Sequence, residues 1–115
     1  MISKTDWQAE YNQEIERALL ARSASNEGMA RVCARRAAGI VIGEYLTRQG
    51  FSGLNNSAYD RLILFASLED VDERCKECAG HFLLKDGPDH QLREDIDLIQ
   101  DIIWLRGKLL SHNND

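Results

Sequence analysis

Apolar residues recur every three or four positions along most of this chain, and that spacing predicts amphipathic α-helices. The first such segment runs from Thr5 to Arg22, where Thr5 and Gln8 match a capping box. A short polar connection, residues 23–26, follows it, so we expect the first two helices to be antiparallel neighbours. The face of the first helix that should point inward carries Trp7, Tyr11, Ile15, Ala18, Leu19 and Arg22.

The second predicted helix, Asn26 to Gly50, differs from the first because its second half has no polar face. A helix that is apolar all round is buried on all sides, which makes this segment the centre of a bundle. Gly39 and Gly43 lie one turn apart and would allow another backbone to approach closely. The residues expected to be buried in every direction are Ala37, Ala38, Ile40, Val41, Ile42, Tyr45 and Leu46.

Three further helices complete the prediction, after a loop rich in Gly, Ser and Asn at Gly50–Asn56. They run from Ala58 to about Leu68, from a break near Glu69–Asp72 to about Leu84, and from about Asp95 to Leu110. Gly87-Pro88 is a stop signal, and residues 111–115 should be a frayed tail. The sequence therefore predicts an all-α protein: one domain, residues 1–115, folded as an up-and-down bundle of four to five helices.

The last predicted helix has an apolar arc of about half its circumference, which is wider than a surface helix usually shows. One edge of the arc carries Ile96, Ile99, Ile103 and Leu110, and the other carries Leu98, Ile102, Leu105 and Leu109. Two edges imply two partners, the bundle itself and a second copy, so we expect a homodimer. Arg106 lies inside this arc, where it must snorkel, pair with a carboxylate or face a bound anion.

Composition narrows the class of protein. The 115 residues are 43% hydrophobic and 29% charged, which is ordinary for a soluble domain, and the net charge of −5 disfavours a generic nucleic-acid binder. Neither a signal peptide nor a membrane-length apolar run is present, so we expect a cytoplasmic protein without membrane contact. Three cysteines, an odd number, fit reduced thiols.

Two clusters resemble metal sites. Cys75 and Cys78 are followed by His81 at metal-ligand spacing, but a second ligand pair is missing and both cysteines fall on an apolar face, so we interpret them as core residues. The acidic cluster Glu94, Asp95, Asp97 and Asp101 suits the N-terminus of the last helix, where the helix dipole favours negative charge. We therefore predict no metal site and no cofactor.

Arg31, Arg35 and Arg36 stand in the first half of the central helix, and Arg31 and Arg35 share a face. One interpretation is a patch that binds phosphate or another anion. The other, which we favour from the sequence, is that these arginines pair with acidic neighbours on the first or last helix.

The segments NEGMARVCARRAAGIVIGEYL (26–46), 71–84 and DIDLIQDIIWL (95–105) together resemble the HEPN domains of prokaryotes. The resemblance covers most of the chain. It implies an up-and-down helical bundle that commonly dimerises. It also implies a nucleotide- or RNA-linked role, because many such proteins are toxin-like ribonucleases partnered by small nucleotidyltransferases, whereas others have no known activity.

Catalytic members of that family carry an arginine, four to six residues and a histidine on the last major helix. Arg106 and His112 match this spacing and location, although Gly107 stands where the family usually has a polar residue. Arg74 and His81 also match the spacing. In such a site the arginine would hold a phosphate and the histidine would move a proton during 2′-hydroxyl attack.

Two functions of different class follow from the sequence. The one we prefer is a non-catalytic, dimeric HEPN-like module that binds a partner protein, such as a minimal nucleotidyltransferase, or a nucleotide. The alternative is a metal-independent ribonuclease of toxin type that uses Arg106 and His112 on RNA.

Overall fold

A computed structural model describes residues 6–84 and 96–110, and those residues form five α-helices and no strand. The prediction of an all-α bundle is therefore confirmed. The helices are α1 (Asp6–Ser23), α2 (Glu27–Arg48), α3 (Ala58–Ser67), α4 (Glu73–His81) and α5 (Leu98–Leu109). Thr5 of the predicted capping box, the start of the last predicted helix at Asp95 and the tail 111–115 lie outside the described residues.

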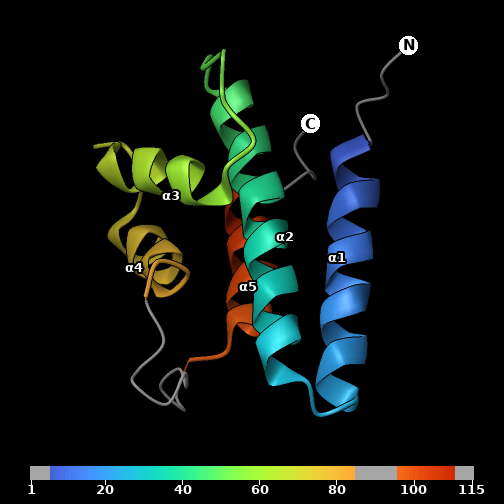
Figure 1. The fold of residues 1–115 in the computed structure, drawn as a ribbon. Coiled ribbons are helices and arrows are strands. Elements are labelled where there is room, and N and C mark those ends of the chain that lie inside the picture. Colours follow the sequence, from blue (N-terminus) through green and yellow to red (C-terminus); the bar gives the residue numbers. More distant parts are fainter. Residues whose placement is uncertain (1–5, 85–95, 111–115) are drawn as a thin grey trace.

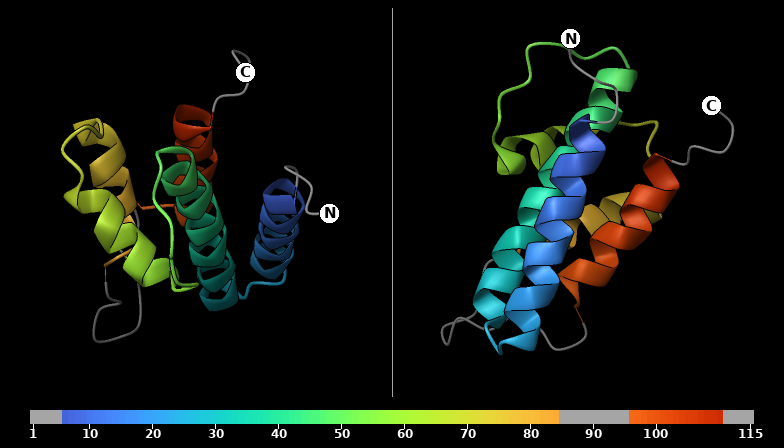
Figure 2. Two further views of the ribbon diagram at one scale, coloured as in Figure 1. Left: turned by 90° about the horizontal axis from the view of Figure 1, so that it is seen from above. Right: turned by 90° about the vertical axis from the view of Figure 1, so that its right-hand side faces the viewer.

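The central position belongs to α2, which contacts α1, α3 and α5. Figure 1 shows α1 and α2 antiparallel, with α5 alongside them and running in the same direction as α2. Helices α3 and α4 lie on the side of this group away from α1, and α3 crosses α2 steeply (Figures 1 and 2). None of the helices in the described residues combines the length and the apolar character needed to cross a membrane.

The connection between α1 and α2 explains their antiparallel packing. Ser25 adopts a left-handed backbone conformation with φ of 61°, which reverses the chain. The side chain of Asn26 then accepts a hydrogen bond from the backbone N–H of Met29 at 3.1 Å and caps α2. The predicted antiparallel pair is confirmed.

The second half of α2 is covered by its neighbours, as its pattern predicts. Ala37, Ala38, Val41, Ile42 and Leu46 have no exposed surface. Ile40 and Tyr45 are only half-buried, so the expectation of complete burial is wrong for these two. They lie on flanks of α2 where a neighbouring helix covers one side of the ring or chain; Tyr45 contacts Phe65 of α3 edge to face, with ring centroids 5.6 Å apart.

Gly39 allows the close approach of another backbone that the sequence predicted, and the approaching element is the start of α3; at Gly43 a side chain of α3 approaches instead of a backbone. A methyl group at Gly39 would lie 2.7 Å from the Cβ of Ala58, the first residue of α3. Arg61, one turn further along α3, covers Gly43 and donates a hydrogen bond to the carbonyl oxygen of Gly39 at 2.9 Å. The two glycines therefore fix where α3 crosses α2.

The apolar faces of the other helices follow their sequence pattern except at Leu19; the exposed Ile103 lies on the arc for which a second partner was expected. The prediction that Cys75 and Cys78 are core residues is confirmed, since both are buried on the face of α4 that also carries the buried Ala79. In contrast, Leu19 of α1 is 49% exposed and Ile103 of α5 is 44% exposed. The prediction that Leu19 packs inward is wrong because α1 packs mainly on α2 and meets α5 only along a narrow line.

Candidate functional site

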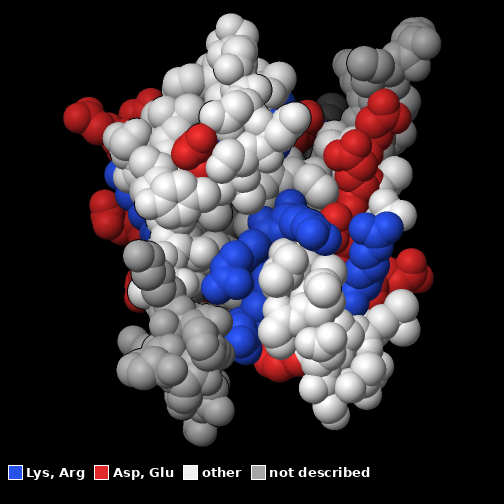
Figure 3. Space-filling view, viewed as in Figure 1, with Lys and Arg blue, Asp and Glu red and all other residues white. Residues whose placement is uncertain are grey.

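The first half of α2 carries a solvent-facing surface that we call the arginine arc: Arg31, Arg35 and Arg36, with Met29 and Val32 beside them. At 100° per residue these five side chains occupy one continuous arc of the helix, with Val32 near its middle. Figure 3 shows basic side chains gathered on this face, over α2 and the neighbouring part of α1, in a chain whose net charge is −5. The structure thus brings the three predicted anion-binding arginines onto one surface.

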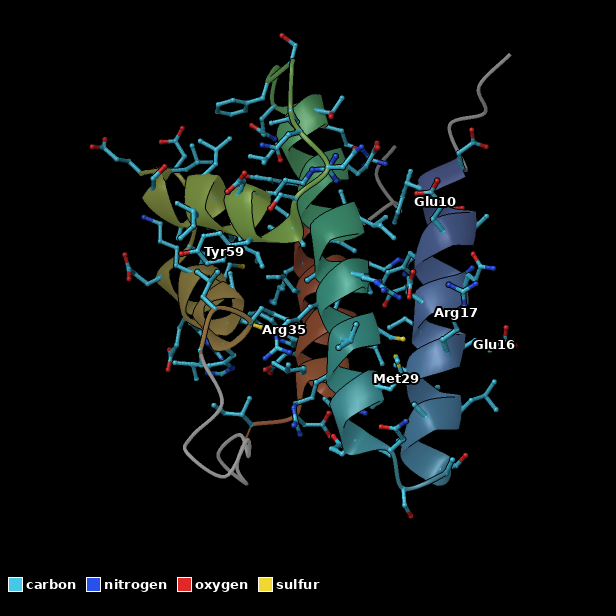
Figure 4. The ribbon with its side chains drawn as sticks, in the orientation of Figure 1. Glu10, Glu16, Arg17, Met29, Arg35 and Tyr59 are labelled. Carbon is cyan, nitrogen blue, oxygen red and sulfur yellow. The ribbon has the colours of Figure 1, made fainter. Side chains whose placement is uncertain are left out.

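Arg35 is the member of the arc that contacts the end of α4. It is half-buried on the side of α2 that faces α4 (Figure 4), and its Nε donates a hydrogen bond to the carbonyl oxygen of Phe82 at 3.3 Å. The bond to a carbonyl oxygen leaves the charge of Arg35 uncompensated by that contact, because a carbonyl carries no net charge. Arg36 is exposed, and among the described residues no carboxylate forms an ion pair with it.

The edge of the arc that faces α1 carries both basic and acidic side chains. Arg17 of α1 lies across from it, at 3.6 Å from Glu14 and with half of its side chain exposed. Between the helices, Cys33 is buried. Burial raises the pKa of this thiol and Glu14 adds to the effect, whereas the positive charges of Arg36 and Arg17 lower it. The positive charges of Arg36 and Arg17 therefore both reach the region around the Cys33 thiol.

The ends of the arc are set by the fold. At its upper end α3 closes onto α2, where Ala58 covers Gly39. At its lower end the chain turns at Ser25 into α1. From Met29 to Arg36 the open part of α2 is about two turns long, or roughly 11 Å. Neither Trp, Tyr nor Phe stands in this stretch, so the arc offers charge and aliphatic surface but no aromatic ring.

Arg106, the first residue of the predicted catalytic pair, is engaged inside the molecule. Its guanidinium carbon lies 5.0 Å from the ring centre of Tyr11 and 5.4 Å from that of Trp7, both on α1. Both distances suit cation–π attraction. Burial raises the pKa of Tyr11, and the charge of Arg106 opposes that shift.

The sequence analysis allowed three environments for Arg106, and this contact with two aromatic rings is none of the three. Its Nε is buried without a hydrogen-bond partner in the described part of the chain, so the aromatic rings compensate for lost solvent. Arg106 thus joins α5 to α1. His112 lies outside the described residues, and the geometry of the predicted pair therefore stays a prediction.

At the opposite end of the α1–α5 contact, Arg22 joins three elements. Its guanidinium lies 3.1 Å from a carboxylate oxygen of Asp97 and 2.7 Å from one of Glu27. The hydrogen bond to Glu27 and the interaction with Asp97 raise the pKa of Arg22. Asp97 also caps α5 by accepting from the backbone N–H groups of Ile99 and Gln100. The sequence predicted the acidic helix start but carried no signal for its distant arginine.

A second polar cluster lies along the seam between α4 and α5. His81 Nδ1 lies 2.8 Å from Asp101 Oδ2, and the Cys78 thiol donates a hydrogen bond to the backbone oxygen of Asp101 at 3.4 Å. Further along, the side chains of Arg74 and Lys108 both lie within 6 Å of the Trp104 ring centre. A pocket of about 280 Å³ opens here, lined by Arg74, Glu77, Cys78, Asp101 and Trp104.

The sequence pattern missed this cluster as a unit. It assigned Asp101 to the helix dipole and His81 to an incomplete metal half-site, because the two residues are twenty positions apart and meet only through the packing of α4 on α5. The one signal that pointed to the region is the spacing of Arg74 and His81, which places both on the same face of α4.

The cysteines behave as core residues in the described structure. All three are buried and unbridged, and burial raises the pKa of each thiol, in the case of Cys78 to about 12. A thiol with such a pKa is protonated at neutral pH and is therefore neither a strong nucleophile nor a ready metal ligand. Among the described residues, no group of three or more His, Cys, Asp or Glu side chains has the arrangement of a metal site.

Comparisons with models of protein families, with curated proteins and with solved structures find no match to this chain.

Proposed function

We propose that this protein is a non-catalytic, dimeric HEPN-like module that acts by binding an anionic partner. The proposal is supported by the resemblance of its sequence to that family and by the arginine arc. The partner is either a protein, such as a minimal nucleotidyltransferase, or a nucleotide. The binding residues are Arg31, Arg35 and Arg36.

The observation that carries the non-catalytic assignment is the position of Arg106 between the rings of Trp7 and Tyr11. A catalytic arginine must reach a phosphate of the substrate, and it stabilises charge in the transition state with donors aimed at that charge. The guanidinium of Arg106 instead lies against two aromatic rings in the contact between α5 and α1. Releasing it for catalysis would cost the cation–π attraction that holds α5 to α1.

The test is an RNA cleavage assay with the purified protein, run in the presence of a chelator. We expect no cleavage above that of a blank preparation. The proposal would be overturned if the wild-type protein cut RNA and the variants Arg106→Ala and His112→Ala both lost cutting while circular dichroism showed them folded. That result would establish the ribonuclease with Arg106 and His112 as its catalytic pair.

A second candidate function, a ribonuclease that uses Arg74 and His81, is favoured by one observation. His81 is held by the carboxylate of Asp101 at its Nδ1, an arrangement that fixes the ring and directs Nε2 outward for proton transfer. Arg74 is exposed on the same face of α4, where it could contact a phosphate. Asp101 would be the positioning residue.

The same assay separates this candidate from the others. Cleavage that survives Arg106→Ala but disappears in both Arg74→Ala and His81→Ala would establish the second candidate. Asp101→Asn would then lower the rate of cleavage, because it removes the carboxylate that positions the histidine. Absence of cleavage by the wild-type protein removes both ribonuclease candidates.

A further inference from the structure

We propose that the arginine arc docks an acidic amphipathic helix of a partner protein. The inference rests on the proposed binding function and names the chemistry of its partner. It is carried by three features of the arc: the sign of its charge, the exposed apolar residues beside the arginines, and its length.

The charge of the arc is opposite to that of the rest of the molecule. The chain has 14 basic and 19 acidic residues, yet basic side chains gather over α2 and the facing part of α1 (Figure 3). Arginine is the residue best suited to carboxylates at an interface, because its planar guanidinium donates two parallel hydrogen bonds to them. Carboxylate groups on a partner would therefore be attracted to this face.

Of the two apolar residues of the arc, Val32 lies between its charges and Met29 lies at its edge, next to Arg36. Val32 is 38% exposed and Met29 is 45% exposed, on the solvent side of α2. Around the helix, Arg31 and Arg35 stand on one side of Val32, and Arg36 stands on the other. A small apolar centre with charged residues at its rim is the usual anatomy of a protein–protein interface, in which Met and Arg are enriched.

This arrangement fits an amphipathic helix better than a nucleic acid. A helix with leucines at three- and four-residue spacing would place them on Val32 and Met29, while glutamates on both flanks reach the arginines. The open stretch of about two turns matches such a contact. Proteins that bind single-stranded nucleic acids combine contacts to phosphates with aromatic rings on which the bases stack, and the arc has no such ring.

One arginine is already held in place for this contact. The Nε of Arg35 donates to the carbonyl oxygen of Phe82, which fixes the side chain before any partner arrives. Its two terminal nitrogens therefore lose little conformational freedom on binding. The Phe82 contact comes from the end of α4, so the packing of α4 also positions the arc.

The experiment is a titration of the isotope-labelled protein followed by NMR. The probe is a capped helical peptide of about four turns with leucines on one face and glutamates on both flanks. Its controls are a twin with glutamine in place of every glutamate and a single-stranded oligouridine. We expect the glutamate peptide to shift the amide signals of Met29, Val32 and Arg36, and the glutamine twin to bind at least about ten-fold more weakly.

Variants test the surface itself. Arg36→Glu should weaken the peptide by at least about ten-fold, and Val32→Ser should weaken it by a smaller factor. Arg48→Glu makes the same change of charge at the other end of α2, where Arg48 pairs with Glu44, and should leave peptide affinity within about two-fold. Both charge variants lie on exposed positions, so circular dichroism should show unchanged helix content.

Three results would overturn the inference: equal affinity for the glutamate peptide and its glutamine twin, tighter binding of oligouridine than of the peptide, or no shift at the arc at millimolar peptide. In each case a protein that cuts no RNA keeps the proposed non-catalytic function, so the two failures are distinguishable.

Discussion

The sequence suggested a catalytic role for Arg106, whereas the structure places this residue in a contact between helices. Its position inside the apolar arc of α5 marked it as unusual, and the family spacing suggested catalysis. In the fold it lies against Trp7 and Tyr11, which stand almost one hundred positions earlier in the chain. A guanidinium is weakly hydrated and stacks well on aromatic faces, so an arginine can replace an apolar residue at such a contact.

Replacement of Arg106 by alanine should therefore lower the free energy of unfolding by about 1–2 kcal/mol, through lost cation–π attraction and lost packing of its stem. Urea unfolding followed by circular dichroism measures the change. Arg74→Ala is the matched control, because Arg74 is exposed and contacts a single ring. An equal loss for the two variants would contradict the structural role of Arg106.

The Cys78 thiol gives a prediction for alkaline pH. Burial raises its pKa from the ordinary value of 9.0 to about 12, so the folded protein keeps a proton that the unfolded chain loses in this range. The folded state then binds more protons, and the free energy of unfolding should fall as the pH rises from about 9 towards 12. Measured by urea unfolding at several pH values, this fall should be less steep in Cys78→Ala. Identical slopes would refute the assignment.

At the scale of elements, the helices follow from local pattern and their crossings follow from small residues. The starts of α2, α3 and α5 are capped by Asn26, Ser57 and Asp97, whose side chains accept from the helix backbone. Gly39 and Gly43 then set the place where α3 meets α2. The sequence predicted a close approach at these glycines but not which element would make it.

Gly39→Ala tests that crossing. The new methyl group would lie 2.7 Å from the Cβ and 3.1 Å from the Cα of Ala58, so the start of α3 must move. We expect a loss of about 1–3 kcal/mol of stability, despite the better helix propensity of alanine.

Gly80→Ala is the control for this prediction, because no atom lies within 4 Å of the added methyl group. It should leave stability unchanged or raise it by up to about 1 kcal/mol. Thermal unfolding of both variants measures the two changes in stability. A stabilising Gly39→Ala would mean that α3 does not press on α2 at this point.

At the scale of the whole molecule, the feature that bears on assembly is the outer side of α5. Most of its apolar arc is buried within the chain, since Leu98, Ile99, Ile102, Leu105 and Leu110 pack inside. Of the arc predicted to have two partners, Ile103 remains on the outside, near the half-buried Trp104. This smaller apolar surface is the part of α5 from which the proposed homodimer would be built.

Light scattering at micromolar concentration should therefore give about twice the chain mass of 13.1 kDa. Ile103→Asp should reduce it to the mass of one chain, because a buried unpaired carboxylate at an interface is costly. Ile63→Asp, at a similarly exposed position on α3, should leave the dimer intact. A monomeric mass for the wild-type protein would remove the dimer from the proposed function.

The sequence by itself determined the helices, their caps, the buried face of α4 and the central place of α2, because periodicity, capping and glycine spacing are local properties of the chain. The prediction from the sequence that Leu19 packs inward is wrong, because the burial of Leu19 depends on how far α5 extends beside α1. The sequence also did not predict that Arg35 contacts the carbonyl oxygen of Phe82 or that Asp101 contacts His81. Those contacts join residues distant in the chain, so only the packing of α4 and α5 against their neighbours decided them.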